Sequence, residues 1–193
     1  MRLAYQPPYD WAAMLGFLSA RAITGLETVV AGVYRRSISV AGRHGWVSVE
    51  PGVGDWLEVT VDFPEPAAMP EIERRLRRMF DLDAVPEVIN AQLSQDPLMA
   101  QLVAARPGLR LPGTWDGLEL AIRAVLGQQI TVVAAIRLAS KLVAQYGLAL
   151  ASPHAGITQL FPTPEVLAAA DLATLGMPKA RGRTLSGVDP VSY

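Results

Sequence analysis

Residues 37–63 read SISVAGRHGWVSVEPGVGDWLEVTVDF, and this stretch decides the fold of the chain. Its apolar side chains recur at every second position: Ile38, Val40, Val47, Val49, Leu57, Val59, Val61 and Phe63. Glycine-containing turns at 41–45 and 51–54 separate the runs. A period of two broken by such turns is typical of antiparallel strands with one apolar face. The stretch therefore predicts a meander that needs a cover on one side.

Helical patterns on both sides of the meander supply that cover. Asp10 can cap a helix in which Trp11, Met14, Leu15 and Leu18 form one stripe, and a second stripe follows within 70–82. A short strand at 3–6 precedes the first helix. We therefore predict an α+β unit, an antiparallel sheet with two helices, over residues 1–88.

Beyond Pro86 we expect no strands, because helix start and stop signals dominate. Asp96, Asp116 and Thr131 are placed to cap three helices, and Asp171 caps a short turn. The last two of the three helices are predicted to end at Gly127 and Gly147. Residues 89–193 are accordingly predicted to form an all-α domain.

Composition limits the classes of protein. The chain has 193 residues, 51% of them hydrophobic, with no cysteine and two histidines, which disfavours a metal site or a disulfide framework. The opening residues lack the pattern of a secretory signal, and Arg137 and Lys141 interrupt the most apolar later stretch. We expect a cytoplasmic protein that does not span a membrane. Basic residues exceed acidic ones only in the second half, where a nucleic-acid site is more favoured.

Three separated stretches carry a resemblance to a known family. They are QPPYDWAAMLGFLSARAI near the start, ARPGLRLPGTWDGLELAIRAVLGQQITVVAA in the middle and FPTPEVLAAADLATLGMPKAR near the end. Together they closely resemble the DNA-3-methyladenine glycosylase II family of the helix-hairpin-helix superfamily.

The resemblance implies half of a TATA-binding-protein-like fold followed by a helical glycosylase domain. It implies a monomer that binds duplex DNA, flips an alkylated purine into an aromatic pocket and hydrolyses the N-glycosidic bond without a metal or cofactor. A cationic alkylated base is attracted to ring faces and is already a good leaving group, which suits this chemistry.

The segment GQQIT at 127–131 lies between two predicted core helices. By the resemblance, Gln129 is the wedge that enters the duplex, Gln128 contacts the flipped nucleotide, and Gly127 allows a close approach. Some relatives have an apolar wedge here. From local pattern alone, the two glutamines merely solvate a helical turn.

Phe17 and Arg21 match positions beside the base pocket, whereas Ala13 replaces a pocket aromatic of relatives. As a structural alternative, Phe17 is a core residue and Arg21 a solvated cation. Trp115 is predicted to pack between domains.

Two basic runs are candidates for contacts with phosphate. Arg74, Arg75, Arg77 and Arg78 follow Glu71 and Glu73, whose spacing to Arg75 and Arg77 favours intrahelical ion pairs on a solvated face. Lys179, Arg181 and Arg183 are better placed to meet DNA in the helical half.

In the family, a phosphate-binding PGIG-like hairpin and the catalytic aspartate come after the position where these residues end. We therefore expect a truncated relative with no catalytic residue of its own, lost or impaired base excision, and apolar surface exposed on the helices that contain Leu118 and Val132. A non-catalytic DNA-binding or interaction module and an inert fragment are the alternatives.

Overall fold

The structure is a computed structural model that describes residues 1–176. Five antiparallel strands form one sheet in the order β1-β5-β4-β3-β2. Their bounds are Arg2–Ala4 for β1, Glu27–Val30 for β2, Val33–Val40 for β3, Arg43–Pro51 for β4 and Trp56–Asp62 for β5. The period-two prediction for 37–63 is confirmed by the β3–β4–β5 meander, and β1 joins its free edge by pairing Leu3 with Leu57.

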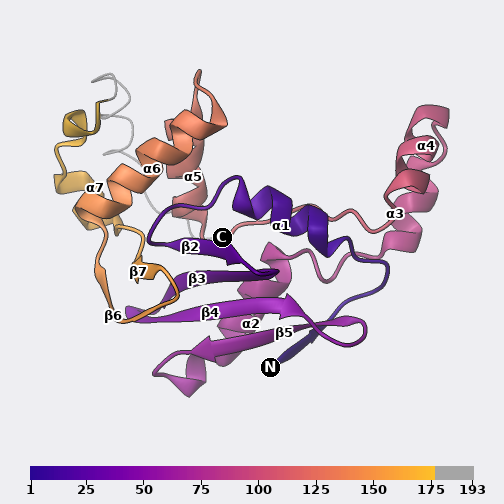
Figure 1. Cartoon of the computed structure of the whole chain (residues 1–193), viewed down its shortest axis with the longest axis horizontal. Helices are drawn as coiled ribbons and strands as arrows, with labels where there is room; N and C mark the ends of the chain where they lie inside the picture. The colour runs from indigo at the N-terminus through magenta and orange to yellow at the C-terminus, as the bar shows by residue number, and fades with distance from the viewer. Residues whose placement is uncertain (177–193) are drawn as a thin grey trace.

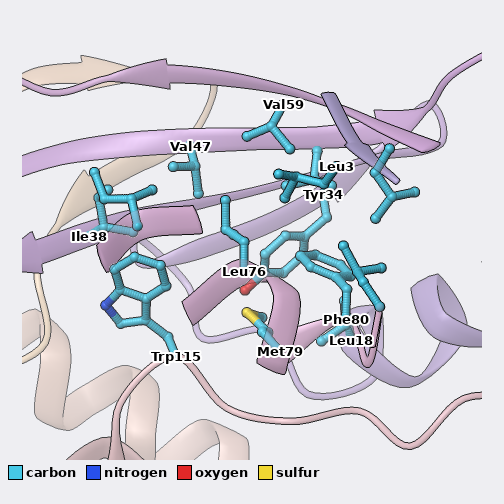
Figure 2. Close-up of a cluster of buried hydrophobic side chains, with 14 of the residues drawn as sticks. Leu3, Leu18, Tyr34, Ile38, Val47, Val59, Leu76, Met79, Phe80 and Trp115 are labelled. Carbon is cyan, nitrogen blue, oxygen red and sulfur yellow. The ribbon is translucent and has the colours of Figure 1, made fainter. Parts of the chain in front are cut away.

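Two helices cover the apolar face of this sheet, as the sequence predicts: α1 (Trp11–Ser19) and α2 (Met69–Met79), the latter preceded by the turn η1 (Pro66–Ala68) (Figure 1). The Asp10 side chain caps α1 by accepting the amide N–H of Ala13 at 2.8 Å. The core between the layers includes Tyr34, Leu76 and Phe80 at 0% exposure (Figure 2).

The second half is mostly helical: α3 (Pro86–Leu93), α4 (Pro97–Ala105), α5 (Gly117–Gly127), α6 (Val132–Tyr146), α7 (Pro164–Ala169) and the turn η2 (Leu172–Leu175). The predicted caps are confirmed, because Asp96, Asp116 and Thr131 each accept hydrogen bonds from the first turn of their helix. The α3–α4 pair stands away from the other helices, at the right of Figure 1. It exposes Val88, Leu98 and Leu102 among other apolar residues.

The expectation of no strands beyond Pro86 is wrong. Strands β6 (Ala149–His154) and β7 (Ile157–Gln159) form a hairpin that lies beside β3 and β4 (Figure 1). The Ser37 hydroxyl donates to the carbonyl of Gln159 at 2.6 Å, and His154 stacks on Trp46 with ring centroids 3.9 Å apart. The second half is thus joined to the sheet through this hairpin, and the fold class is α+β.

Candidate functional site

A cavity of about 1250 Å³ lies between the two halves of the chain. Its walls come from α1, α2, α5, α6 and the segment 112–116 that precedes α5. Phe17 and Arg21 line it from α1 and the turn after it, and Gly127 and Ile130 line it from the α5–α6 connection. Folding therefore brings three of the five predicted site residues, Phe17, Arg21 and Gly127, to one cavity.

Phe17 presents its ring to the cavity and is 38% exposed, so it is not a core residue. The Arg21 guanidinium lies over this ring, with its central carbon 3.9 Å from the ring centroid. The same guanidinium donates to the carbonyl of Phe17 at 3.3 Å. The spacing of four residues thus places a cation on an aromatic face at the wall of the cavity.

The α5–α6 connection turns tightly beside this wall. Gln128 and Gln129 lie between two cavity-lining residues, and both are exposed. Gln129 has φ of 58°, a left-handed conformation that is uncommon outside glycine. Gly127 is helical, and a Cβ there would meet the Ala135 Cβ at an ordinary 3.8 Å. Neither backbone conformation nor packing within the chain therefore requires glycine at 127.

A buried ion network, which the sequence did not predict, forms the floor of the cavity. Its members are Glu27 on β2, Arg36 on β3, and Glu119 and Arg123 on α5. Arg36 donates to Glu119 at 2.6 Å, and Arg123 donates to both Glu27 and Glu119 at 2.6 Å. Arg36 and Glu119 are each 2% exposed. The network fixes α5 to the sheet by charge as well as by packing.

The pKa values of the groups in this network are set by their charged neighbours as well as by burial. Burial on its own would raise the pKa of Glu119, but Arg36 and Arg123 outweigh it and hold the pKa of this carboxyl below its ordinary value. Burial would likewise lower the pKa of Arg36, yet Glu119 and its other neighbours raise that pKa. Glu119 and Arg36 are therefore both charged near neutral pH, and each stabilises the charge of the other.

The arginines of α2 are largely paired, and Arg74, Arg75 and Arg78 line the cavity. Arg74 and Arg75 both donate to Glu71, at 2.8 and 2.6 Å. The hydrogen bond from Arg74, followed by that from Arg75, outweighs partial burial and lowers the pKa of Glu71 to about 2.

The predicted ion pair of Glu71 with Arg75 is confirmed. The predicted partner of Arg77 is wrong, because Arg77 pairs with Asp83, which lies past the end of α2, instead of Glu73. The spacing of four residues permits a pair but does not exclude a nearer carboxylate that the turn after the helix brings in.

Trp115 packs where the two halves meet and is 3% exposed, as predicted. In Figure 2 its indole lies at one end of the core cluster, below Ile38 in this view. The guanidinium carbons of Arg36 and Arg75 lie 5.5 and 5.2 Å from its ring centroid. Both aromatic residues that line the cavity, Phe17 and Trp115, therefore carry arginine on a ring face.

Other predictions concern absences or residues farther along the chain. Lys179, Arg181 and Arg183 lie outside the described residues. Within residues 1–176, no cluster of His, Asp or Glu side chains could hold a metal ion. None of the helices in the same range is long and apolar enough to cross a membrane. Exposed apolar side chains do occur on α5 and α6: Leu120 is 52% exposed and Val132 48%.

The cavity is lined by aromatic rings, apolar side chains, arginines and three carboxylates. Its lining combines the Phe17 ring and apolar side chains of α5 and α6 with arginines, which suit phosphate oxygens. The three carboxylates in the lining are Glu27, Asp116 and Glu119. Glu27 and Glu119 belong to the ion network. Asp116 caps α5 by accepting the amide N–H groups of Leu118 and Glu119.

The chain is similar in sequence to known DNA repair proteins. It is 40% identical over 187 residues to DNA-3-methyladenine glycosylase 2 of Escherichia coli, which covers 95% of this chain and 64% of that protein. It is 38% identical over 190 residues to the probable bifunctional transcriptional activator/DNA repair enzyme AlkA of Mycobacterium tuberculosis, covering 97% of this chain and 38% of that protein. The chain thus spans less than two thirds of either relative.

Solved structures show the same fold. The 3-methyladenine DNA-glycosylase from Archaeoglobus fulgidus matches with a TM-score of 0.85 and 23% identity, covering 96% of this chain and 65% of that one. The 8-oxoguanine glycosylase/lyase of Clostridium acetobutylicum in complex with double-stranded DNA matches with a TM-score of 0.57 and 16% identity, covering 84% and 63%. The α+β fold is therefore that of DNA glycosylases.

The profile of the AlkA N-terminal domain matches residues 1–116. This range holds the sheet, both of its covering helices, Phe17 and Arg21, and it ends at the cap of α5. The resemblance stated from the sequence is confirmed, and the chain belongs to the AlkA N-terminal domain family.

Proposed function

We propose that this chain forms the wedge and one wall of the base pocket of a DNA glycosylase that acts on alkylated purines. One observation carries the proposal. Phe17 and Arg21 line one cavity together with Gly127, which lies more than a hundred residues later in the sequence. The exposed Gln128 and Gln129 project beside it. A base turned out of a duplex needs a cavity with an aromatic wall next to a group that fills the vacated stack.

In this proposal Gln129 enters the duplex and hydrogen-bonds the base left without a partner. Gln129 lies in the α5–α6 turn, is exposed and has a left-handed backbone conformation, which supports this assignment. Gln128 contacts the flipped nucleotide, and Gly127 leaves room for the DNA backbone. The proposed ligand is duplex DNA with an alkylated base, bound by a monomer without a cofactor in the cytoplasm. The proposed division is into two units, 1–88 and 89–193, and residues of both ranges line the cavity.

In this proposal the chain binds damaged DNA but does not itself hydrolyse the glycosidic bond. Each of the three carboxylates in the cavity is held by arginine or by a helix cap, as described above. A carboxylate engaged in this way is less available to stabilise a sugar cation or to orient water, because part of its acceptor capacity and charge is already used. We therefore expect the 193-residue chain to bind abasic and alkylated duplexes without releasing base. The amount of free base released from methylated duplex, separated by chromatography, measures this directly, and release above the rate without protein would contradict it.

The wedge is tested by fluorescence anisotropy with two labelled duplexes that differ only in one abasic-site analogue. Gln129→Ala removes about one hydrogen bond, worth roughly a fivefold change in affinity, from the abasic duplex and little from the intact one. Gln101→Ala, an exposed glutamine on α4, is the matched control. Equal losses on both duplexes would remove the wedge assignment.

Salt dependence distinguishes the alternatives. Binding through phosphates weakens steeply as salt rises, because counterions are released on association. Salt-sensitive binding without preference for the abasic duplex would favour a general DNA-binding module. No binding at low salt would leave an inert fragment, and the proposal would fail.

A further inference from the structure

Both aromatic rings of the cavity are already covered by cations, but the cations are held differently. Arg36 and Arg75, which lie over Trp115, are tied to carboxylates: Arg36 to Glu119 at 2.6 Å and Arg75 to Glu71 at 2.6 Å. Arg21, which lies over Phe17, has no carboxylate within 4 Å among the described residues. Among the described residues, the only hydrogen bond of the Arg21 side chain is the 3.3 Å bond to the main-chain carbonyl of Phe17. Of the three arginines that lie over these two rings, Arg21 would therefore lose the fewest polar contacts by moving away from its ring.

The main chain at Arg21 is fixed, although its side chain is loosely held. Arg123 donates to the carbonyl of Arg21 at 2.9 Å, and Arg123 is itself part of the buried ion network. Movement at this position is therefore confined to the Arg21 side chain, which can rotate away from Phe17 without disturbing α1. Rotation would expose the ring face that is now 3.9 Å from the guanidinium.

A guanidinium and a cationic base compete for the same place. Both are drawn to the negative face of an aromatic ring, and two like charges cannot share it. An incoming nucleotide, however, also carries phosphate, whose oxygens bind a guanidinium in a planar, bidentate manner more strongly than a ring face does. The phosphate of a nucleotide could thus draw Arg21 away as its base reaches Phe17.

We propose that Arg21 is a displaceable lid on Phe17 that nucleotide phosphate releases. While the Arg21 side chain covers Phe17, it weakens binding of a free cationic base to this ring. The same base binds more tightly when it carries a phosphate, because the phosphate draws Arg21 away from the ring. This inference rests on the proposed base-binding role of the cavity, and it adds a positioning residue that couples recognition of phosphate to stacking of the base.

The test uses two probes that differ only in phosphate: N7-methylguanosine, whose base is cationic, and its monophosphate. Binding of each is measured by calorimetry to the full chain and to two variants. Arg21→Ala removes the lid. Arg2→Ala is the control, because the Arg2 guanidinium also lies over an aromatic ring, that of Trp56, but Arg2 does not line the cavity.

The unaltered chain should bind the monophosphate at least about fivefold more tightly than the nucleoside. Arg21→Ala should increase affinity for the nucleoside by roughly twofold to fivefold, the size of one exposed cation–π contact, and should reduce the advantage of the monophosphate. Arg2→Ala should leave the preference between the two probes unchanged. Weaker binding of the nucleoside to Arg21→Ala, or the same response in both variants, would overturn the lid while leaving base binding intact.

A second measurement does not depend on base binding. In protein with isotope-labelled arginine, the Arg21 Nε–H resonance is displaced by the ring current of Phe17, and Arg21→Lys assigns it by its loss. Inorganic phosphate should return this resonance toward the position of an unstacked arginine. If neither nucleoside probe binds, the base-binding role proposed above fails, and this titration alone then decides the lid. A resonance that phosphate does not move would overturn it.

Discussion

Replacing Glu119 by glutamine should be among the most damaging single changes in this fold. Glu119 accepts hydrogen bonds at 2.6 Å from Arg36 and from Arg123, and its side chain is 3% exposed. The glutamine side chain would retain one acceptor oxygen but direct an amide N–H₂ at a guanidinium, and the substitution would leave two buried cations with one buried anion. Removing one partner of such a network costs about 3–5 kcal/mol.

This loss is large enough to measure by both chemical and thermal unfolding. For a chain of this length, 1 kcal/mol shifts Tm by about 2–4 °C, so Glu119→Gln should lower Tm by roughly 6–20 °C. Glu73→Gln, on the exposed face of α2, is the control and should stay within about 0.5 kcal/mol of the unaltered chain. The double variant Arg36→Met with Glu119→Leu should cost less than Glu119→Gln, because it leaves Glu27 and Arg123 as a balanced pair.

The pH dependence of stability distinguishes the electrostatic contribution of Glu119 from its packing contribution. The pKa of Glu119 lies below its ordinary value of 4.5, so ionised Glu119 stabilises the fold at pH values above about 4.5. That contribution is lost as the pH falls through the lower pKa of the folded state. The stability difference between the unaltered chain and Glu119→Gln should therefore shrink in acid. A Tm within about 2 °C of the unaltered value at neutral pH, or a difference independent of pH, would refute the electrostatic account.

Three other changes have distinct expected outcomes. Gly45→Ala would place a Cβ 2.0 Å from the carbonyl oxygen of Asp62 in the next strand, so it should destabilise by at least about 2 kcal/mol in urea unfolding. Gly127→Ala should leave the free energy of unfolding unchanged or raise it by up to about 1 kcal/mol, yet weaken binding of abasic duplex in the anisotropy assay; unchanged binding would contradict the close approach of DNA. His154→Ala should remove the stack on Trp46, cost about 0.5–1.5 kcal/mol and speed amide exchange in β6 and β7, whereas unchanged exchange would show that the stack does not hold the hairpin.

The sequence predicts an element correctly where residues close to one another along the chain determine its structure. The caps at Asp10, Asp96, Asp116 and Thr131 follow from side chains that bond amides within three residues. The meander at 37–63 likewise follows from its alternation and its glycine turns.

The β6–β7 hairpin could not be predicted in this way, because partners distant in sequence hold it. A bridge joins Ile157 to Gly25, and the Ser37 hydroxyl binds the Gln159 carbonyl. The local sequence ASPHAG at 151–156 has no period of two, so pattern alone indicates a loop.

The candidate site was predicted in part through the resemblance and not through spacing. Phe17 and Gly127 could be placed at one cavity only by reference to a family whose fold is known. The ion network did leave a signal: Arg36 falls on the inward face of β3 with Tyr34 and Ile38, where an unpaired charge would be costly. An arginine in that position implies a buried acidic partner, but the sequence does not reveal that Glu119 supplies it.

The bond from Arg123 to the Arg21 carbonyl has a mechanical consequence. It links α5 to the turn after α1, which carry opposite walls of the cavity, and the same guanidinium holds Glu27 on the sheet. These contacts restrain the two walls of the cavity against separate movement. The cavity is therefore preorganised: the conformational entropy of its walls is lost during folding and is not lost again when a ligand binds. We therefore expect a large deformation on binding to occur in the occupant, and not in the cavity.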